Sequence, residues 1–502
     1  MRKWWPLVAI CAGACMLLVD VTIVNVALPD MARQLHTTFS DLQWVIDLYA
    51  LVLGALVLTV GAVADRFGRR RLYLIGLVLF AAASLACGLA PNVGLLIAAR
   101  GVQGVGAAAM FATTMALISN TYTGRERGMA FGIWGAVNGA ASAVGPIIGG
   151  LLTADFGWRW IFLVNLPVSV VAVAMTLKVI GESKDPNPKR IDLPGMVSFT
   201  VAAAALTYAL IRGAWASTET ITLIAVTAVA LAVFVIAERR NPAPMLDLKL
   251  LRNRTFTAML LAGALLSAAA WAAMTYQSLW LQSVLGLSAI KAGLVVLPCA
   301  ASAFIVSSQV GRFLHRTSPR WMVGLGLLVI AVGALAQAVL RENSSWSVVI
   351  PGLVLVGIGA GLAMASLTST AMSAVPGQQA GMAGGALSAF RQLGYALGIA
   401  VLGEVFDSGL SHGLSHGAGP GLSAALSGGQ AQAVLARTPA LAPVVHRAFA
   451  DGLDFAYVVA GGFGLLAAVL VFTLVRQRPQ AGVAAAAGEP RASEPAPASA
   501  EA

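Results

Sequence analysis

Charged residues are scarce in this sequence. Asp, Glu, Lys and Arg make up 11% of the 502 residues, whereas hydrophobic residues make up 58%. Soluble domains carry about 25% charged residues, and the mean hydropathy of this chain is +0.83. This composition excludes an ordinary water-soluble protein and predicts one that is embedded in a membrane.

Cysteine is also rare, and its rarity excludes two kinds of scaffold. The four cysteines, Cys11, Cys15, Cys87 and Cys299, all fall within hydrophobic runs, where we expect them to act as small buried side chains. Neither a disulfide framework nor a metal cluster follows from this pattern. We therefore predict no metal site.

Two functional signatures are missing as well. The chain has no GxxxxGK[ST] loop, so ATP is not expected to drive its activity. No cluster of His, Asp or Glu with catalytic spacing lies at the edge of a hydrophobic run. The sequence therefore predicts neither an enzyme nor a bound cofactor.

Long hydrophobic runs recur along the whole chain. A helix needs about 20 apolar residues to cross a bilayer, and about fourteen runs have this length. They are too long for strands, and helices satisfy their own backbone hydrogen bonds in lipid. The predicted fold class is an all-α integral membrane protein. The runs lie near residues 6–28, 44–64, 72–90, 93–119, 129–153, 161–180, 193–212, 219–237, 256–281, 289–310, 321–340, 348–375, 382–406 and 455–475.

Most of the 32 Lys and Arg residues fall on one side of this topology. Loops rich in Lys and Arg stay in the cytoplasm, so we expect the basic loops and both termini to be cytoplasmic. The net charge of +11 is then a topology signal, and it implies no nucleic-acid partner. The basic segments are the N-terminus, 66–71, 125–127, 184–190, 239–254, 312–320 and the tail.

Two distant segments repeat one another. GMAFGIWGAVNGAASAVGPIIGG, from Gly128, aligns with GMAGGALSAFRQLGYALGIAVLG, from Gly381, and Gly106 aligns with Gly359 at the same offset of 253 residues. One offset for two separate runs indicates a duplicated six-helix unit, although Gly-rich membrane helices can also match by chance. Two such halves, related by an axis along the membrane normal, are a transporter plan with the substrate site between them.

The repeat divides the chain into segments. The first half is predicted at residues 1–180 and the second at 256–475, with two inserted helices at 193–237. The connecting segments are a cytoplasmic linker at 181–192, an amphipathic cytoplasmic linker at 238–255, an extracytoplasmic loop at 407–454 and a disordered tail at 476–502.

The loop GAVADRFGRRR lies between the second and third runs. Its first glycine permits close helix approach, its acid can accept from Arg or backbone donors, and its last glycine permits a tight turn. The alternative is a simple basic turn at the cytoplasmic face. The residues of this conformational motif are Gly61, Asp65, Arg66, Gly68, Arg69 and Arg70.

Two further motifs lie inside hydrophobic runs. LIAARGVQGVGAA contains Arg100, whose charge is costly in a membrane unless it faces a partner or water. GAVNGAASAVGPIIGG contains a Gly-Pro pair that should bend and thin the helix, although small residues can also serve packing alone. The residues of this second motif are Gly135, Gly139, Gly145, Pro146, Gly149 and Gly150.

These motifs resemble those of one family. The Gly61–Arg71 loop is similar to the signature loop of the major facilitator superfamily, and the Arg100 segment is similar to its fourth-helix Arg motif. The Gly-Pro segment resembles the motif of its exporters. LVDVTIVNVALP, WRWIFLVNLP and FRQLGYALGIAVLG resemble signatures of its fourteen-span drug:proton antiporters.

The resemblance implies a function. Such a protein would export small amphipathic toxic compounds in exchange for protons, by alternating access of its two halves, from a bacterial cytoplasmic membrane. The proton gradient would supply the free energy, and the partners would be a small-molecule substrate, protons and the lipid bilayer. The family's loop motif would act as a latch between the halves. We expect a monomer.

Asp20 is an acid inside the first hydrophobic run. An intramembrane acid is unfavourable by a few kcal/mol, and such groups serve as proton carriers in pumps and transporters. The alternative is that Asp20 bonds to Thr22, Asn25 or another helix and fixes packing. The predicted proton-coupling residues are Asp20, Arg100 and, as the weakest of the three, Asp47.

Several polar and aromatic residues are candidates for lining a substrate pocket, although a lipid-facing aromatic belt is the alternative for the aromatic ones. Arg391 could pair with an acid or bind an anionic group. The run near 289–310 has no acid, which by resemblance favours monovalent cations or neutral molecules over divalent cations. The pocket candidates are Asn25, Gln103, Asn138, Trp271, Tyr276, Gln277 and Arg391.

Two other functions remain open at this point. The protein could export one metabolite, such as an antibiotic that the cell makes itself. From a different class, it could be a membrane sensor that kept the fold and lost transport, although no output domain is visible.

Overall fold

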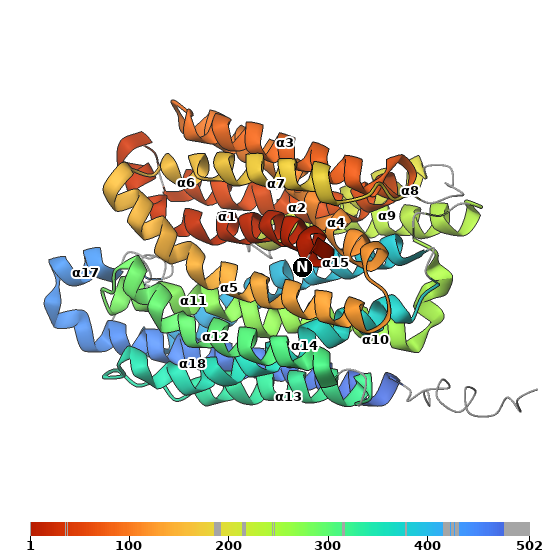
Figure 1. The fold of residues 1–502 in the computed structure, drawn as a ribbon. Helices are drawn as coiled ribbons and strands as arrows, with labels where there is room; N and C mark the ends of the chain where they lie inside the picture. The colour runs from red at the N-terminus through yellow and green to blue at the C-terminus, as the bar shows by residue number, and fades with distance from the viewer. Residues whose placement is uncertain are drawn as a thin grey trace, which may run out of the picture.

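The hydrophobic runs fold as helices, and the described part of the chain contains no strand. In the computed structural model the helices lie side by side in an elongated bundle (Figure 1). Parts of the predicted linkers and outer loop, and the tail 476–502, lie outside the described residues. The described residues are 2–35, 37, 39–184, 192–212, 217–242, 244, 246–313, 317–376, 379–414, 422, 426 and 431–475.

The first six predicted spans form one group of helices. After the short turn η1 (Arg2–Trp4), this group consists of α1 (Trp5–Leu35), α2 (Phe39–Phe67), α3 (Arg69–Gly88), α4 (Val93–Thr121), α5 (Gly124–Phe156), α6 (Trp160–Leu163) and α7 (Asn165–Val179). The last two together are long and apolar enough to cross a membrane.

The second group begins with a rod that contains two π-helical turns. It consists of α10 (Arg254–Leu266), η3 (Ser267–Ala272), α11 (Ala273–Leu279) and η4 (Trp280–Val284). The remaining long helices of this group are α12 (Ala289–Phe313), α13 (Pro319–Gln337), α14 (Ile350–Ser373), α15 (Ala380–Leu414) and α18 (Ala442–Leu474). Short elements connect them: η2 (Leu248–Arg252), η5 (Trp346–Val349), α17 (Ala431–Arg437) and η7 (Pro439–Leu441).

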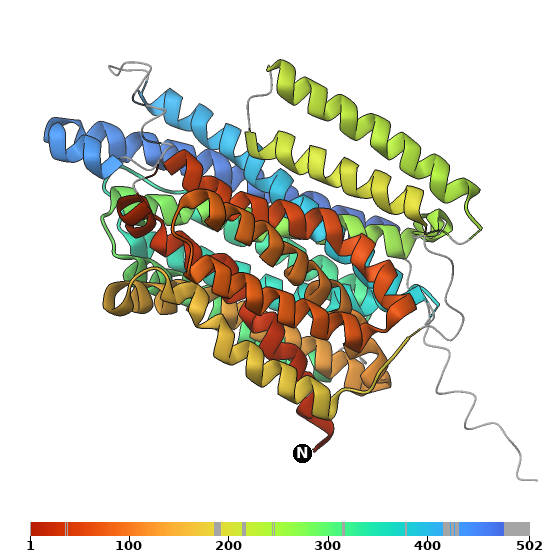
Figure 2. The same cartoon turned by 90° about the horizontal axis from the view of Figure 1, so that it is seen from above.

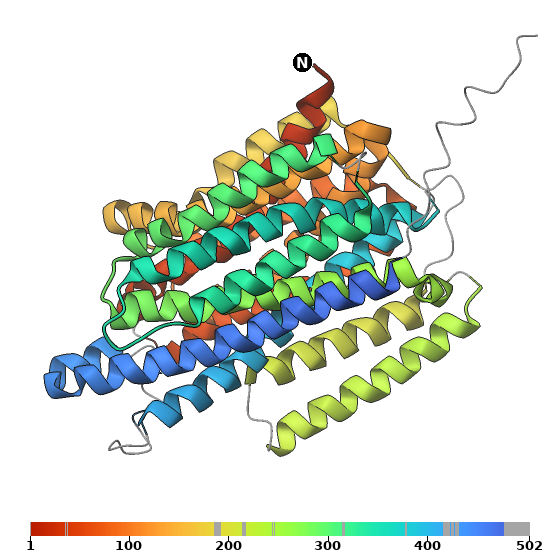
Figure 3. The ribbon, with the colours of Figure 1, turned by 90° about the horizontal axis from the view of Figure 1, so that it is seen from below.

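Two inserted helices lie beside the main bundle. α8 (Leu193–Arg212) and α9 (Thr218–Arg240) form a pair to one side, as Figures 2 and 3 show. α8 packs against α2 and α15, one helix from each group. The hydroxyl groups of Thr59 on α2 and Thr200 on α8 lie 3.1 Å apart. The insertion therefore covers the seam between the groups.

Eleven described helices are long and apolar enough to cross a membrane, and the bent α2 makes twelve. Shorter apolar stretches, Ile147–Phe156 and Leu193–Ala209, belong to α5 and α8. Large apolar side chains cover the outer surface; Val170 on α7 is 69% exposed and Val229 on α9 is 64% exposed. Such a surface suits lipid rather than water. The prediction of an all-α multi-pass membrane protein is confirmed.

The predicted repeat is visible in helix packing. A Cβ added to Gly106 on α4 would lie 2.9 Å from the carbonyl oxygen of Gly76 on α3. In the second group, a Cβ added to Gly359 on α14 would likewise clash with the carbonyl oxygen of Gly326 on α13. Because both pairs need glycine for close backbone approach, α3–α4 and α13–α14 are equivalent units.

The two groups meet near one end of the bundle, which we call the basic end because it carries residues 66–71. An added Cβ at Gly61 on α2 would lie 3.9 Å from the Cα of Gly385 on α15. Ser307 Oγ on α12 donates to the carbonyl of Gly132 on α5 at 3.0 Å. These four positions lie within about 12 Å of the helix ends that face the basic end. The groups are therefore in contact at that end.

The repeat packing leads to a stability prediction. Gly106→Val and Gly359→Val should each lower the free energy of unfolding by about 1–3 kcal/mol, because the new side chains would press on backbone atoms. The measurement is thermal unfolding of the detergent-purified protein. Gly462→Val is the matched control, since nothing lies within 4 Å of a Cβ added there. Equal unfolding temperatures for Gly359→Val and Gly462→Val would contradict the equivalence of α3–α4 and α13–α14.

Candidate functional site

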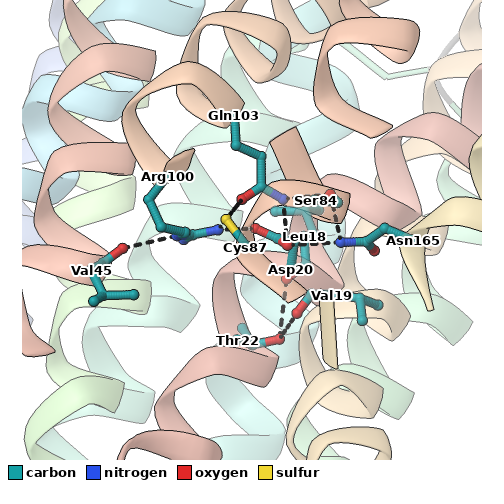
Figure 4. Close-up of polar contacts among 10 residues, drawn as sticks. All are labelled: Leu18, Val19, Asp20, Thr22, Val45, Ser84, Cys87, Arg100, Gln103 and Asn165. Carbon is teal, nitrogen blue, oxygen red and sulfur yellow. Dashed lines mark hydrogen bonds and ion pairs between the residues drawn. The ribbon is translucent and has the colours of Figure 1, made fainter. Parts of the chain in front are cut away.

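Asp20 lies at the centre of a buried polar cluster in the first group of helices (Figure 4). Asp20, Arg100, Gln103 and Ser84 are each 0% exposed, and Asn165 is 3% exposed. These side chains come from α1, α4, α3 and α7. Polar groups this deeply buried are unfavourable unless they bond to one another, so the cluster depends on the fit among four helices.

A short ion pair joins Asp20 to Arg100. Arg100 Nη1 donates to Asp20 Oδ2 at 2.5 Å, and its Nε donates to the carbonyl oxygen of Val45 on α2 at 2.8 Å. The guanidinium group also lies over the ring of Tyr49, 4.2 Å from its centroid. Removal from water is costly for both ions. Their mutual attraction and these additional contacts offset that cost.

The second carboxylate oxygen of Asp20 is occupied by two amides. Gln103 Nε2 and Asn165 Nδ2 each donate to Asp20 Oδ1 at 2.9 Å. The same two amide nitrogens donate to Ser84 Oγ at 2.9 and 3.3 Å. Both oxygens of the carboxyl group are therefore held by side chains from other helices, which is the arrangement that the packing alternative required.

The local sequence explains how the helices come this close. Arg100 and Gln103 lie three residues apart and share one face of α4. A Cβ added to Gly104 would lie 2.8 Å from the carbonyl oxygen of Tyr49, so only glycine lets α2 approach α4 here. This approach brings the Val45 carbonyl within reach of Arg100.

Sequence reasoning missed three members of the cluster. Asn165 stands inside the quoted segment WRWIFLVNLP, and its polar amide among apolar residues was a usable signal. Ser84 and Tyr49 carry no such signal, because hydroxyl groups are common in membrane helices. Gln103, which the sequence predicts to line a substrate pocket, is a member of this cluster.

Other predicted residues occupy different places. Tyr276 Oη donates to the carbonyl of Ile399 at 2.6 Å, within the second group. Gln277 lines a cavity of about 10 Å³ inside the same group, and Trp271 packs against its core. Asn25, Asp47, Gly139 and Pro146 lie on described helices, but their side-chain surroundings fall outside the description. Asn138, Gly135 and Gly150 lie on α5, and Arg391 lies on α15.

The repeat does not extend to the ion pair. Leu353 and Val356 occupy the positions on α14 that are 253 residues beyond Arg100 and Gln103. The two groups therefore share a scaffold, while the first carries an acid and a base that the second replaces with apolar side chains.

The loop at residues 61–71 makes a tight turn from α2 into α3. Gly68 has φ 113°, and a Cβ there would lie 2.7 Å from Glu182 Oε1. Arg69 pairs with Asp65 at 2.8 Å, and the two following backbone N–H groups donate to the Glu182 carboxylate at 3.1 and 3.2 Å. Glu182, which sequence reasoning did not single out, ties this turn to the segment after α7.

The Gly-rich segment of α5 bridges the cluster and the other group of helices. An added Cβ at Gly145 would clash with Thr22 on α1, and Gly149 packs against α1 as well. Towards the basic end, Gly132 accepts the hydrogen bond from Ser307 of α12. α5 therefore contacts α1 at Thr22, just after Asp20, and it also contacts α12 of the second group.

Comparison with known families agrees with this architecture. The sequence pattern of the Major Facilitator Superfamily matches residues 10–399, which extend from α1 into α15.

The chain belongs to the Major Facilitator Superfamily. This confirms the family to which the motifs pointed, and membership makes the protein a transporter rather than an enzyme.

Curated relatives of this superfamily member are resistance and efflux proteins. The multidrug resistance protein Stp of Mycobacterium tuberculosis (strain CDC 1551 / Oshkosh) is 40% identical over 81% of this chain and 76% of its own length. The tetracenomycin C resistance and export protein of Streptomyces glaucescens is 31% identical over 94% of this chain and 92% of its own length.

A solved structure shares the superfamily fold. The human organic anion transporter MFSD10 (TETRAN) superposes with a TM-score of 0.62 and 16% identity, over 93% of this chain and 99% of that one. At this identity the likeness concerns the fold alone.

The ion pair leads to a pH-dependent stability prediction. Arg100→Gln leaves a buried carboxylate without its cation, and proton uptake can neutralise that group. We therefore expect Arg100→Gln to unfold at a higher temperature at pH 5 than at pH 8, relative to wild type. The measurement is thermal unfolding across this range.

The matched control is Asp20→Asn/Arg100→Gln, which has no carboxyl group in the cluster and should lose the added pH dependence. Asp20→Leu should be about 3–5 kcal/mol less stable at every pH, because Arg100 would remain charged and unpaired. The same pH profile in Arg100→Gln and the double variant would contradict the prediction.

Proposed function

We propose that the protein is a proton-coupled exporter of small amphipathic toxic compounds. The observation that carries the proposal is the Asp20–Arg100 pair, buried in the first half and absent from the equivalent positions of the second. A titratable group in such a place is suited to carrying a proton across the membrane. The names of the relatives, which describe resistance and export, support the direction of transport.

The membrane placement forms part of the proposal. We propose that α1 to α5, α6–α7, α8, α9, the α10–η4 rod, α12 to α15 and α18 make fourteen spans, with both termini in the cytoplasm of a bacterium. The basic end would then be cytoplasmic, because it carries the arginine-rich loop at 66–71. The proton gradient would supply the free energy without a cofactor, and one chain would suffice.

The contacts of the cluster suggest how a proton could drive movement. Protonation of Asp20 would remove its attraction for Arg100 and weaken the bonds from Gln103 and Asn165. α1 would then be free to shift relative to α4. Because Gly145 holds α5 against α1, that shift would be transmitted to α5.

From α5 the shift would reach the other half. α5 is bonded to α12 through Gly132 and Ser307 near the basic end, where the halves touch. A movement of α5 would therefore bear directly on the contact that closes this end. Opening here and closing at the far end is the rocking motion of alternating access.

A second candidate is export of one compound rather than many. It is favoured by the relative from Streptomyces glaucescens, whose name gives a single antibiotic, tetracenomycin C. Both candidates use the same proton site and differ only in the range of compounds that are carried.

The test is substrate-induced proton release in inside-out vesicles that contain the purified protein. A compound that is transported should dissipate the pH gradient in wild type, and Asp20→Asn and Arg100→Ala should each abolish the response, because neither variant keeps the acid together with its cation. Asp155→Asn, an exposed acid at the end of α5, is the matched control and should respond like wild type.

The outcomes separate the candidates. A response to many unrelated drugs supports the multidrug proposal, and a response to one supports a dedicated exporter. An equal response from Asp20→Asn would show that Asp20 only fixes packing. If no compound causes proton release in wild type, the result would favour a sensor that no longer transports.

A further inference from the structure

Arg391 lies on α15, one helical turn beyond a contact between the two halves. On α15, Gly384, Ser388 and Arg391 follow one another at helical spacing and share a face. An added Cβ at Gly384 would lie 3.4 Å from Met115 Cβ on α4, and Ser388 Oγ lies 3.9 Å from Met115 Sδ. Arg391 is one turn further from the basic end, just beyond this contact.

The side chain of Arg391 is partly exposed, but its Nε and Nη1 atoms are buried and have no hydrogen-bond partner among the described residues. No salt bridge to Arg391 occurs in the described part of the chain. Its Cγ lies 3.2 Å from a Cβ added to Gly263 on α10, so the absence of a side chain there leaves it room. An arginine keeps its charge in any protein, so this one is an uncompensated cation within the membrane.

Arg100 shows that this protein can supply partners to an arginine within the bundle. Arg100 binds an acid, an amide and a backbone carbonyl, and it stacks over an aromatic ring. An unpaired charge in a membrane interior costs several kcal/mol. A residue with that cost and no partner among the described residues is expected to meet its counter-charge in a bound molecule.

The repeat places a second polar residue at the equivalent position. Asn138 on α5 precedes Arg391 by the repeat offset of 253 residues and is 7% exposed. Each of the two helices contacts the opposite half, α5 through α12 and α15 through α2 and α4. The equivalent sites thus carry an amide in one half and a guanidinium group in the other.

The acids of neighbouring spans are distant from Arg391. α2 and α15 run antiparallel, with Gly54 beside Gln392 and Gly61 beside Gly385. This register places position 47 of α2 level with position 399, about 12 Å along the axis from Arg391. Glu404 lies about 20 Å from Arg391 along the axis of α15. The backbone positions therefore leave the guanidinium without a nearby acid on these helices.

We propose that Arg391 binds an anionic group of the exported compound, such as a carboxylate or sulfonate on an otherwise apolar molecule. The planar guanidinium group holds such oxygens through two parallel hydrogen bonds, and its site lies between the halves, where transporters bind substrates. The inference rests on the proposed export function. It differs from the expectation drawn from the acid-free run at 289–310, which favoured cations or neutral molecules.

The test compares matched probes on the full-length protein in lipid nanodiscs at pH 7.5. The probes are fusidate, which carries a carboxylate, its neutral methyl ester, and the cation ethidium. Wild type should bind fusidate about ten- to a hundredfold more tightly than the ester, as expected for a charged hydrogen-bonded pair. Arg391→Gln should lose this preference and bind the ester unchanged, while Arg391→Lys should keep part of it.

Stability gives a second readout that a purely structural role would not produce. Without ligand, Arg391→Gln should melt at or above the wild-type temperature, because it removes an unpaired buried charge. Arg341→Gln, at an exposed arginine, is the matched control and should change neither binding nor melting. A large loss of stability in Arg391→Gln, with Arg391→Lys retaining no preference, would show that Arg391 supports the fold rather than a ligand.

The outcomes also separate this inference from the proposed function. Equal binding of fusidate and its ester by wild type, or an unchanged preference in Arg391→Gln, would overturn the anion site. If ethidium still drives proton release in vesicles, export stands and only the substrate class is wrong. If fusidate binds through Arg391 but no compound releases protons, the anion site stands and proton-coupled export fails.

Discussion

An isolated charge is hardly tolerated in the interior of a membrane protein, and the first half of this one is arranged around that constraint. Asp20 and Arg100 neutralise each other at 2.5 Å. Further hydrogen bonds to the pair come from Val45 on α2, Gln103 on α4 and Asn165 on α7. Ser84 on α3 in turn accepts from the two amides. Each of these helices must therefore approach α1 or α4 closely, and a shift of any one leaves a buried polar atom without a partner.

Glycine makes these approaches possible. Hydrophobic residues give little drive for association in lipid, so close packing between small residues takes their place. Gly104 lets α2 reach α4, and Gly145 lets α5 reach α1. The same property connects the ion pair to the contact between the halves, since α5 carries close contacts to both. Packing and the proposed transmission of movement thus depend on the same residues.

The duplicated scaffold carries unlike chemistry in its two halves. α3–α4 and α13–α14 pack through equivalent glycines, yet Leu353 stands where the first half has Arg100. At another pair of equivalent positions the relation is reversed, because the charge, Arg391, lies in the second half and the neutral Asn138 in the first. A symmetric fold would in this way separate the proposed proton site in one half from the proposed substrate-binding charge in the other.

The sequence by itself determined the helical membrane class, the internal repeat and the superfamily, because hydropathy, spacing and motifs are local properties of the chain. It also singled out Asp20 and Arg100, since a charge in an apolar run is conspicuous. Only the tertiary structure decided that these two, 80 residues apart, form a pair, and that Asn165 and Ser84 complete it. It also placed Gln103 in that cluster, bonded Tyr276 to the backbone of Ile399, and set Gln277 beside a small cavity. Which faces of two helices meet depends on the packing of the whole bundle, and no local pattern encodes that.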